Sequence, residues 1–140
     1  MNLSRPFRII RSLRKNRIPG QLVIQFTDAC NARCPQCGMR VTETFSRSRI
    51  PINDIRRIID AAARKGIEAI SFTGGEPLLF FDDLLNMIRH AGAAGIPWIR
   101  TGTNGFIFSG SNKSGFRDRI RNIAERLAAT PIRNFWISID

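Results

Sequence analysis

The sequence lacks the features of a secreted or membrane-embedded protein. None of its apolar runs approaches the ~20 residues that a membrane-spanning helix needs. Its N-terminus has no apolar signal core, because arginines interrupt it at positions 5, 8, 11 and 14. It has only three cysteines, an odd and clustered set that makes a poor disulfide framework. These absences favour a reducing, cytoplasmic setting for a chain of 140 residues, which is one domain at most.

Acidic residues are missing from the start of the chain, where the first one is Asp28. Residues 1–20 carry five arginines and one lysine, and the whole chain has a formal net charge of +11. Apolar residues at mostly helical spacing accompany these cations, at Phe7, Ile10, Leu13 and Ile18. The pattern predicts a basic helical arm over residues 1–20, followed by the main domain over residues 21–140. The arm either covers one end of the domain or contacts an anionic membrane or nucleic acid.

The rest of the chain alternates between strand and helix patterns. Short apolar runs at residues 22–26, 69–72, 98–101 and 135–139 predict four strands. Helical spacing predicts three helices between them, one over residues 52–62 with Asn53 as N-cap, one from Asp82 or Asp83 to Gly95, and one over residues 116–127. This alternation indicates an α/β fold of parallel strands joined by right-handed crossover helices.

Polar or glycine-rich segments follow each predicted strand. They are residues 30–37, 73–77, 103–105 and 138–140. Functional residues of parallel sheets lie beyond the carboxyl ends of the strands, so we expect all four segments to meet at one rim. No helix follows the last strand of this sequence, which resembles the front part of a larger barrel.

The cysteines Cys30, Cys34 and Cys37 have the spacing C-x3-C-x2-C. Three thiolates can hold a four-iron cluster and leave one iron without a protein ligand, open to chemistry. Zinc sites more often repeat C-x2-C, and a Cys3His zinc site would need His90, the only histidine. His90 lies in the second helix pattern, near the end opposite the cysteines, where an ordinary surface histidine is expected. The spacing therefore favours an iron–sulfur cluster.

The three cysteines after a first strand, together with the Gly-Gly-Glu-Pro sequence of residues 74–77 after a second, resemble the radical S-adenosylmethionine (SAM) superfamily. The resemblance spans about residues 21–140 and implies that Cys30, Cys34 and Cys37 bind a [4Fe–4S] cluster. It also implies that the fourth iron binds SAM, and that an electron from the cluster cleaves SAM to methionine and a 5′-deoxyadenosyl radical. In such a protein the cofactors carry the chemistry and the protein positions them.

The same resemblance assigns further residues to SAM. It places the segment Gly74, Gly75, Glu76 and Pro77 at the amino end of the SAM methionine, with Glu76 either binding that ammonium or fixing the loop. It places Thr103 and Asn104 beside SAM and assigns Ser138 and Asp140 to its ribose or carboxylate. Gln36 stands before the third cysteine, where much of the family has an aromatic residue near the adenine, so that contact becomes polar or passes through the backbone.

The resemblance also sets expectations for the whole protein. The family fold has six βα units, whereas this sequence predicts about four strands, so we expect a partial barrel of the radical SAM type that stops after its fourth strand. An electron donor such as flavodoxin or ferredoxin is implied, and the substrate stays open. The alternatives are a truncated, non-catalytic fragment that retains the cluster motifs, and a basic zinc protein that binds nucleic acid or a membrane.

Six other positions carry weaker expectations. Arg33 and Arg40 flank the cysteines, where they either stabilise an anionic cluster or remain solvated. Arg47 and Arg49 form a basic loop suited to an anionic substrate. Trp98 and Trp136 lie in strand patterns, which favours packing in the core over stacking on a ligand.

Overall fold

The computed structural model describes residues 7, 10, 20–38 and 46–138. These residues form one four-stranded sheet with three crossover helices. The strands are β1 (Gln21–Thr27), β2 (Ala69–Gly74), β3 (Trp98–Thr103) and β4 (Asn134–Ile137). The helices are α2 (Ile52–Arg64), α3 (Phe81–Ala93) and α4 (Phe116–Ala128). Two short 3₁₀ helices, Pro77–Phe80 and Phe106–Phe108, follow β2 and β3.

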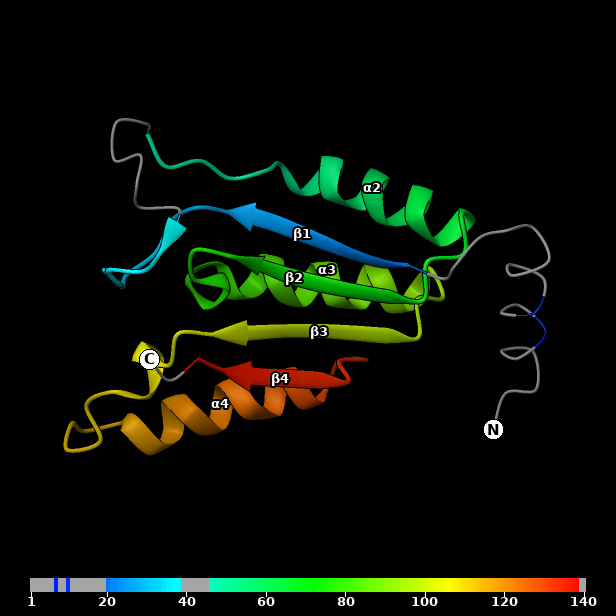
Figure 1. Ribbon diagram of the computed structural model, residues 1–140. Helices are drawn as coiled ribbons and strands as arrows, with labels where there is room; N and C mark the ends of the chain where they lie inside the picture. The colour runs from blue at the N-terminus through cyan, green and yellow to red at the C-terminus, as the bar shows by residue number, and fades with distance from the viewer. Residues whose placement is uncertain (1–6, 8–9, 11–19, 39–45, 139–140) are drawn as a thin grey trace.

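The sheet has the order β1-β2-β3-β4, and every neighbouring pair of strands is parallel. All four arrowheads point the same way in Figure 1, so the carboxyl ends of the strands share one edge. The predicted α/β fold with four parallel strands and three crossover helices is therefore confirmed. Each strand lies beside the next one in the chain, as in a (β/α) barrel, whereas the strand order of a doubly wound sheet reverses at a switch point.

One face of the sheet packs against the helices and carries the hydrophobic core; we call it the covered face. Ile24, Phe72 and Phe135 stand in one register row of this face, and Phe72 is completely buried. The helices contribute Ile55 and Ile59 from α2 and a longer buried stripe from α3, made of Leu84, Leu85, Met87, Ile88 and Ala91. Burying such apolar side chains stabilises the fold by about 1.5–3 kcal/mol each.

The opposite face of the sheet faces the viewer in Figure 1, with α3 behind it. We call it the open face; strand alternation and register give it the residues Gln21, Val23, Gln25, Ala69, Ser71, Thr73, Trp98, Arg100, Gly102, Asn134 and Trp136. Both tryptophans therefore lie outside the helix-covered core, contrary to the expectation from sequence. Trp98 is 45% exposed, and Trp136 is half-buried against Gly102.

Several helix ends differ from prediction. The N-cap of α2 is Pro51 and makes no side-chain cap, so the prediction of Asn53 is wrong. Proline fixes its own φ and starts the helix two residues earlier than a polar cap would. Asp82 and Asp83 lie in the first turn of α3 instead of capping it, where their charges still favour the helix dipole. The predicted helix end at Gly95 is confirmed, since this glycine has positive φ, and Gly66 has the same conformation after the end of α2.

Of the predicted basic arm, only Phe7, Ile10 and Gly20 are among the described residues. The prediction that residues 1–20 form a helix therefore concerns residues outside the described part of the chain. Asp140 and Arg40 also lie outside the described residues. Within the part of the chain that is described, no helix is both long and apolar enough to cross a membrane.

Candidate functional site

The cysteine segment follows the carboxyl end of β1 and forms an irregular loop. Cys30 is exposed, Cys34 and Cys37 are half-buried, and all three are free thiols. The backbone N–H of Cys37 donates to the carbonyl of Cys34 at 3.1 Å, which closes a turn between these two cysteines. The N–H of Ala32 donates to Sγ of Cys30 at 3.4 Å. Gln36 is exposed within the same turn.

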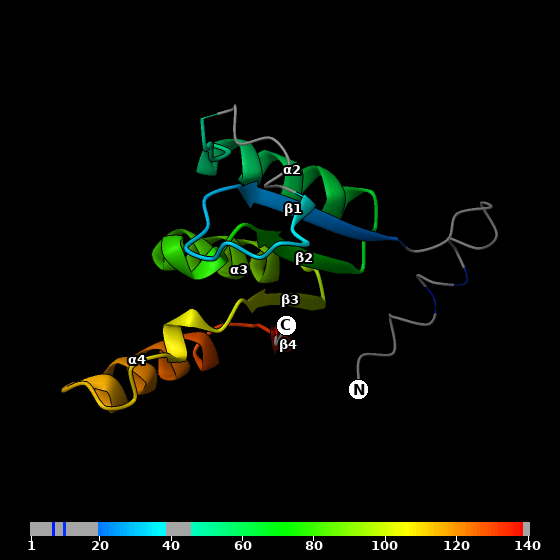
Figure 2. The same ribbon diagram turned by 60° about the vertical axis from the view of Figure 1, so that its left-hand side comes forward.

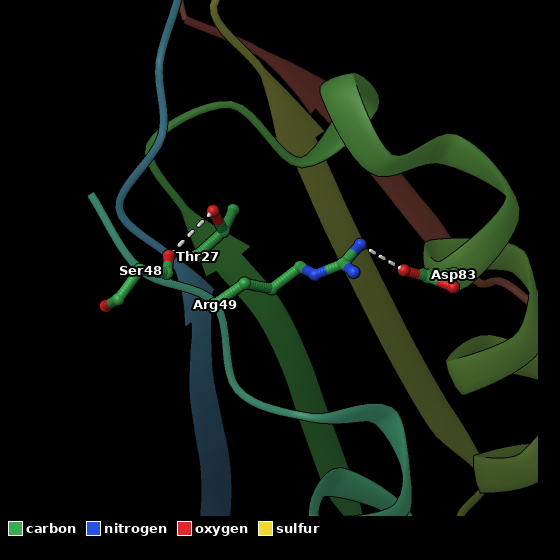
Figure 3. A network of polar contacts seen from close by, with 4 residues as sticks. All are labelled: Thr27, Ser48, Arg49 and Asp83. Atoms are coloured by element: carbon green, nitrogen blue, oxygen red, sulfur yellow. Dashed lines mark hydrogen bonds and ion pairs between the residues drawn. The ribbon is translucent and has the colours of Figure 1, made fainter. Parts of the chain in front are cut away.

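The chain returns from this loop along the end of β1, in a segment of residues 48–50 that we call the strap. The N–H of Ile50 donates to the carbonyl of Phe26 at 2.9 Å, and Arg49 forms an antiparallel bridge with Thr27. The N–H of Ser48 donates to Oδ1 of Asp28 at 2.5 Å. The hydroxyl of Thr27 donates to the carbonyl of Ser48 at 3.3 Å (Figure 3). The strap therefore fixes both ends of the cysteine segment at the same strand.

Arg49 connects the strap to α3. Its guanidinium pairs with the carboxylate of Asp83, as Figure 3 shows, and lies 4.6 Å from the ring centroid of Phe80. The sequence predicted that Arg49 would face an anionic substrate. In the structure its charge is paired with Asp83, and the expectation of an anionic substrate at Arg49 stays a prediction. Because both partners are partly exposed, the pair contributes modestly to stability, about 0.2–1 kcal/mol.

Gly74 and Gly75 let the loop after β2 lie directly against the loop after β1. The N–H of Gly75 donates to the carbonyl of Thr27, and that of Glu76 to the carbonyl of Ala29, each at 2.8 Å. A Cβ on Gly74 would lie 2.2 Å from the Thr27 carbonyl oxygen, and one on Gly75 would lie 2.1 Å from that of Ala29. The close approach that these glycines permit is thus between two backbones of the protein itself.

Glu76 is 2% exposed and uses both carboxylate oxygens within the protein. Oε1 accepts from the N–H of Leu78 at 2.9 Å and caps the 3₁₀ helix that begins at Pro77. Oε2 accepts from the N–H of Asn104 at 2.7 Å. Of the two roles that the sequence allowed for Glu76, the structure shows the one that fixes the loop.

Asn104 brings the loop after β3 to the cysteines. Its Nδ2 donates to Oδ1 of Asn31 at 2.8 Å and to Sγ of Cys30 at 3.5 Å, while its Oδ1 accepts from the N–H of Phe106 at 3.0 Å. This pattern satisfies the amide oxygen and uses both amide hydrogens, which fixes the orientation of the side chain. Three of the four predicted segments therefore meet through Cys30, Asn104 and Glu76.

The fourth segment reaches the same rim through the backbone, since the N–H of Ser138 donates to the carbonyl of Thr103 at 2.9 Å. The side chain of Ser138 is exposed. Thr103 is 3% exposed, and its hydroxyl accepts from the N–H of Gly105 at 3.2 Å, so it shapes the turn after β3. The expected rim is thus built by all four strand ends.

His90 lies in α3 and pairs with Oδ1 of Asp60 in α2 at 2.8 Å. His90 lies in the last turn of α3, and its contact with Asp60 links α3 to α2. Among the described residues, no three cysteine, histidine or acidic side chains are grouped to hold a single metal ion. A preformed Cys3His zinc site is therefore not seen in the part of the chain that is described.

The donor set at the rim fits an iron–sulfur cluster. Each thiolate of such a cluster binds a different iron, so the three thiols need not converge on one point. Three free thiols lie within one loop, and N–H groups of Ala32 and Asn104 already point at one of them. Hydrogen bonds from N–H groups to sulfur stabilise the thiolate form that binds iron.

Sequence reasoning missed two residues of the rim. Asn31 accepts the hydrogen bond that aligns Asn104, and Thr27 both accepts from the N–H of Ala29 at 3.1 Å and holds the strap. Neither belongs to a recognisable spacing, because their partners lie 73 and 21 residues away in the sequence. A hydroxyl at the end of a strand is the one available signal, since such residues often bond to the turn that follows.

Comparison with known proteins gives a family match and a group of relatives. A family model described as the Radical SAM superfamily matches residues 24–140. Curated relatives include GTP 3′,8-cyclases from three strains of Vibrio cholerae serotype O1, each 34% identical over 90 residues. The matched part covers 61% of this chain and 26% of each cyclase, so the chain spans about a quarter of the length of these relatives.

Proposed function

The chain belongs to the radical SAM superfamily, and from this premise we propose that it is the cofactor-binding part of a radical SAM enzyme. In this proposal Cys30, Cys34 and Cys37 hold a [4Fe–4S] cluster, and residues 21–140 form the core domain. The bound cluster supplies the electron that cleaves SAM reductively to methionine and a 5′-deoxyadenosyl radical.

One observation carries the proposal: the contacts that join Cys30 to Asn104 and Asn104 to Glu76. A glycine-rich turn or an Asn-Gly turn has an ordinary structural explanation when it stands alone. Here the side chain of Asn104 joins the turn after β3 to the cysteine loop, and the side chain of Glu76 joins the turn after β2 to the backbone of Asn104. A cysteine cluster with a purely structural role would not need this alignment.

The proposal refines the role of each rim residue. Glu76 uses both oxygens on backbone N–H groups, so we assign the contact with the SAM amino group to the backbone of residues 74–76. Glu76 and Pro77 then hold that backbone in place. Gln36 and Ser138 present exposed side chains at the rim and are the residues we assign to polar contacts with SAM. Thr103 acts through its turn, and Asn104 acts on the Cys30 thiolate.

The test is anaerobic reconstitution of the chain with iron and sulfide. We expect about four irons and four sulfides per chain, the stoichiometry of a [4Fe–4S] cluster, and the brown absorption of such a cluster. Replacing any one cysteine, as in Cys34→Ser, should abolish the cluster, whereas His90→Ala should leave it unchanged because His90 is occupied by Asp60. Zinc without labile sulfide in the purified protein would overturn the proposal in favour of the zinc alternative.

Reductive cleavage is tested separately, by adding SAM and a chemical reductant and measuring 5′-deoxyadenosine. Formation of this product supports an active enzyme. A loaded cluster with no product would favour the non-catalytic alternative. Flavodoxin or ferredoxin is the electron donor that we propose for the protein in the cell, in a cytoplasmic setting.

The first substrate to test is GTP. The relatives are named as GTP cyclases, and the chain has a net charge of +11, which favours an anionic substrate. GTP consumption by the loaded protein, compared with ATP at the same concentration, distinguishes this candidate. Equal inertness towards both nucleotides would remove GTP as the substrate.

A further inference from the structure

The open face of the sheet differs from the interior of an ordinary barrel. Packed barrel interiors are dominated by branched apolar side chains such as Val, Ile and Leu. On the open face, Val23 is the one residue of that kind, and glutamine, serine, threonine, asparagine and arginine fill most other positions. A sheet surface of this composition suits a polar ligand better than a packed core.

Arg100 is the only charged residue of the open face as its register defines it. It stands in the middle of β3, in the same register row as Ser71 of β2 and Asn134 of β4. No ion pair involving Arg100 is found among the described residues. A lone guanidinium flanked by hydroxyl and amide donors is an arrangement that attracts an anionic oxygen group.

The Nε atom of Arg100 is buried and has no hydrogen-bond acceptor among the described residues. An unsatisfied buried N–H group is unfavourable and calls for an explanation. A carboxylate or phosphate that binds arginine in bidentate fashion places one oxygen on Nε and another on a terminal nitrogen. Such a ligand would satisfy the atom that the protein leaves unpaired.

Trp136 holds the Arg100 side chain in place. The guanidinium carbon lies 5.7 Å from the centroid of the Trp136 ring. The ring in turn lies flat against Gly102, where an added Cβ would be 2.2 Å from Cε2 of the indole. Gly102 thus makes room for the tryptophan, and the tryptophan orients the arginine through a cation–π contact.

We propose that Arg100 binds an anionic oxygen group, phosphate or carboxylate, of the molecule on which this protein acts. Arg100 precedes Asn104 by four residues, a span of roughly 13 Å along a parallel strand. A ligand anchored at Arg100 therefore extends towards the rim where Asn104 contacts Cys30. The assignment of that ligand as substrate rests on the proposed function, whereas the anion site itself does not.

The two tryptophans allow a direct test, because Trp136 becomes the only one when Trp98 is replaced by phenylalanine. In the Trp98→Phe chain, inorganic tripolyphosphate and citrate are titrated separately while the fluorescence of Trp136 is recorded. We expect saturable quenching by at least one anion, and the stronger of the two identifies phosphate or carboxylate as the preferred group. The absence of saturable binding by both anions would overturn the proposal.

Two matched substitutions separate a site from general attraction to a basic protein. Arg100→Gln should weaken binding about tenfold or more, as expected from losing one charge-assisted hydrogen bond of ordinary strength. Arg121→Gln removes one positive charge from the exposed surface of α4 and should change binding less than threefold. Equal weakening by both substitutions would show nonspecific attraction and reject the site.

Arg100→Lys keeps the charge but not the bidentate geometry, so its affinity should fall between those of the wild type and Arg100→Gln. The circular dichroism spectrum of each variant checks that the fold is retained. Iron and sulfide are measured on the same samples. A chain that binds the anion through Arg100 but assembles no cluster would disprove the proposed function and leave the anion site standing, so the two failures are distinguishable.

Discussion

The covered face of the sheet and the rim at its carboxyl end stabilise the same four strands by different means. The covered face buries apolar side chains from α2 and α3 in a continuous core. The rim instead joins three loops through backbone approach at Gly74 and Gly75 and through the two oxygens of Glu76. Stability on the covered face scales with buried area, whereas at the rim it depends on individual atoms in fixed positions.

The largest effect should come from the covered face. Phe72→Ala removes a completely buried ring and should lower the free energy of unfolding by about 3–5 kcal/mol. Val23→Ala is the matched control, because Val23 is 56% exposed on the opposite face and should cost no more than about 0.5 kcal/mol. Urea denaturation of the two variants measures the difference. Equal losses of unfolding free energy in the two variants would mean that the open face is packed as tightly as the covered face.

The second effect tests whether the rim tolerates even one carbon atom. In Gly75→Ala, the new Cβ would meet the Ala29 carbonyl, which is backbone and cannot rotate away. We expect a loss of about 1–3 kcal/mol together with a reduced iron content after reconstitution. Gly38→Ala lies in the cysteine loop with nothing within 4 Å of the new Cβ, so it should leave both measurements unchanged. If Gly75→Ala kept its iron, the close packing of the loop after β2 against the cysteine loop would not be needed for cluster binding.

The third effect concerns the carboxylate of Glu76. Glu76→Gln keeps the shape of the side chain but turns an amide NH2 towards one of two backbone N–H groups, which should cost about 1–3 kcal/mol. Hydrogen exchange of the Asn104 amide should also become faster. Glu125→Gln, on the exposed surface of α4, serves as the control. A neutral result for Glu76→Gln would mean that the hydrogen bonds of the rim add nothing beyond packing.

The smallest effect belongs to the ion pair between Arg49 and Asp83. A double-mutant cycle with Arg49→Ala and Asp83→Ala should give a coupling energy of about 0.2–1 kcal/mol, since both side chains are partly exposed. The coupling should fall as salt is raised. A coupling energy above that range would mean that this ion pair is a main source of the strap's stability. The difference in stabilisation between the rim and the core would then be smaller than we expect.

The strands and helices could be predicted because their signals are local. The strand predicted over residues 69–72 is part of β2, and the helix predicted over residues 116–127 matches α4 to within one residue. The start of α2 could not be predicted from Asn53, because Pro51 begins the helix by fixing its own backbone angle. The 3₁₀ helix after Glu76 was also missed, since four residues are too few to show a helical period.

The sequence predicted where the rim lies, at the carboxyl ends of the strands, but not which atoms make contact there. The rule for strand ends brought the segments of Cys30, Glu76 and Asn104 to one edge. Which atoms meet there depends on register between strands that are far apart in sequence, such as the 28 residues between Glu76 and Asn104. The partner of Arg49 was unpredictable for the same reason, because Asp83 lies 34 residues away.

The strap has a consequence for assembly of the site. Ser48 bonds to Asp28 across 20 residues of sequence, so the segment that contains all three cysteines is a closed loop anchored to a strand. Closing a loop of this length costs conformational entropy that grows only with the logarithm of its length, and here folding bears that cost in advance. The three thiols are therefore held at a high effective concentration before any iron arrives. Once one thiolate has bound iron, the other two thiols would reach the growing cluster from within the same loop.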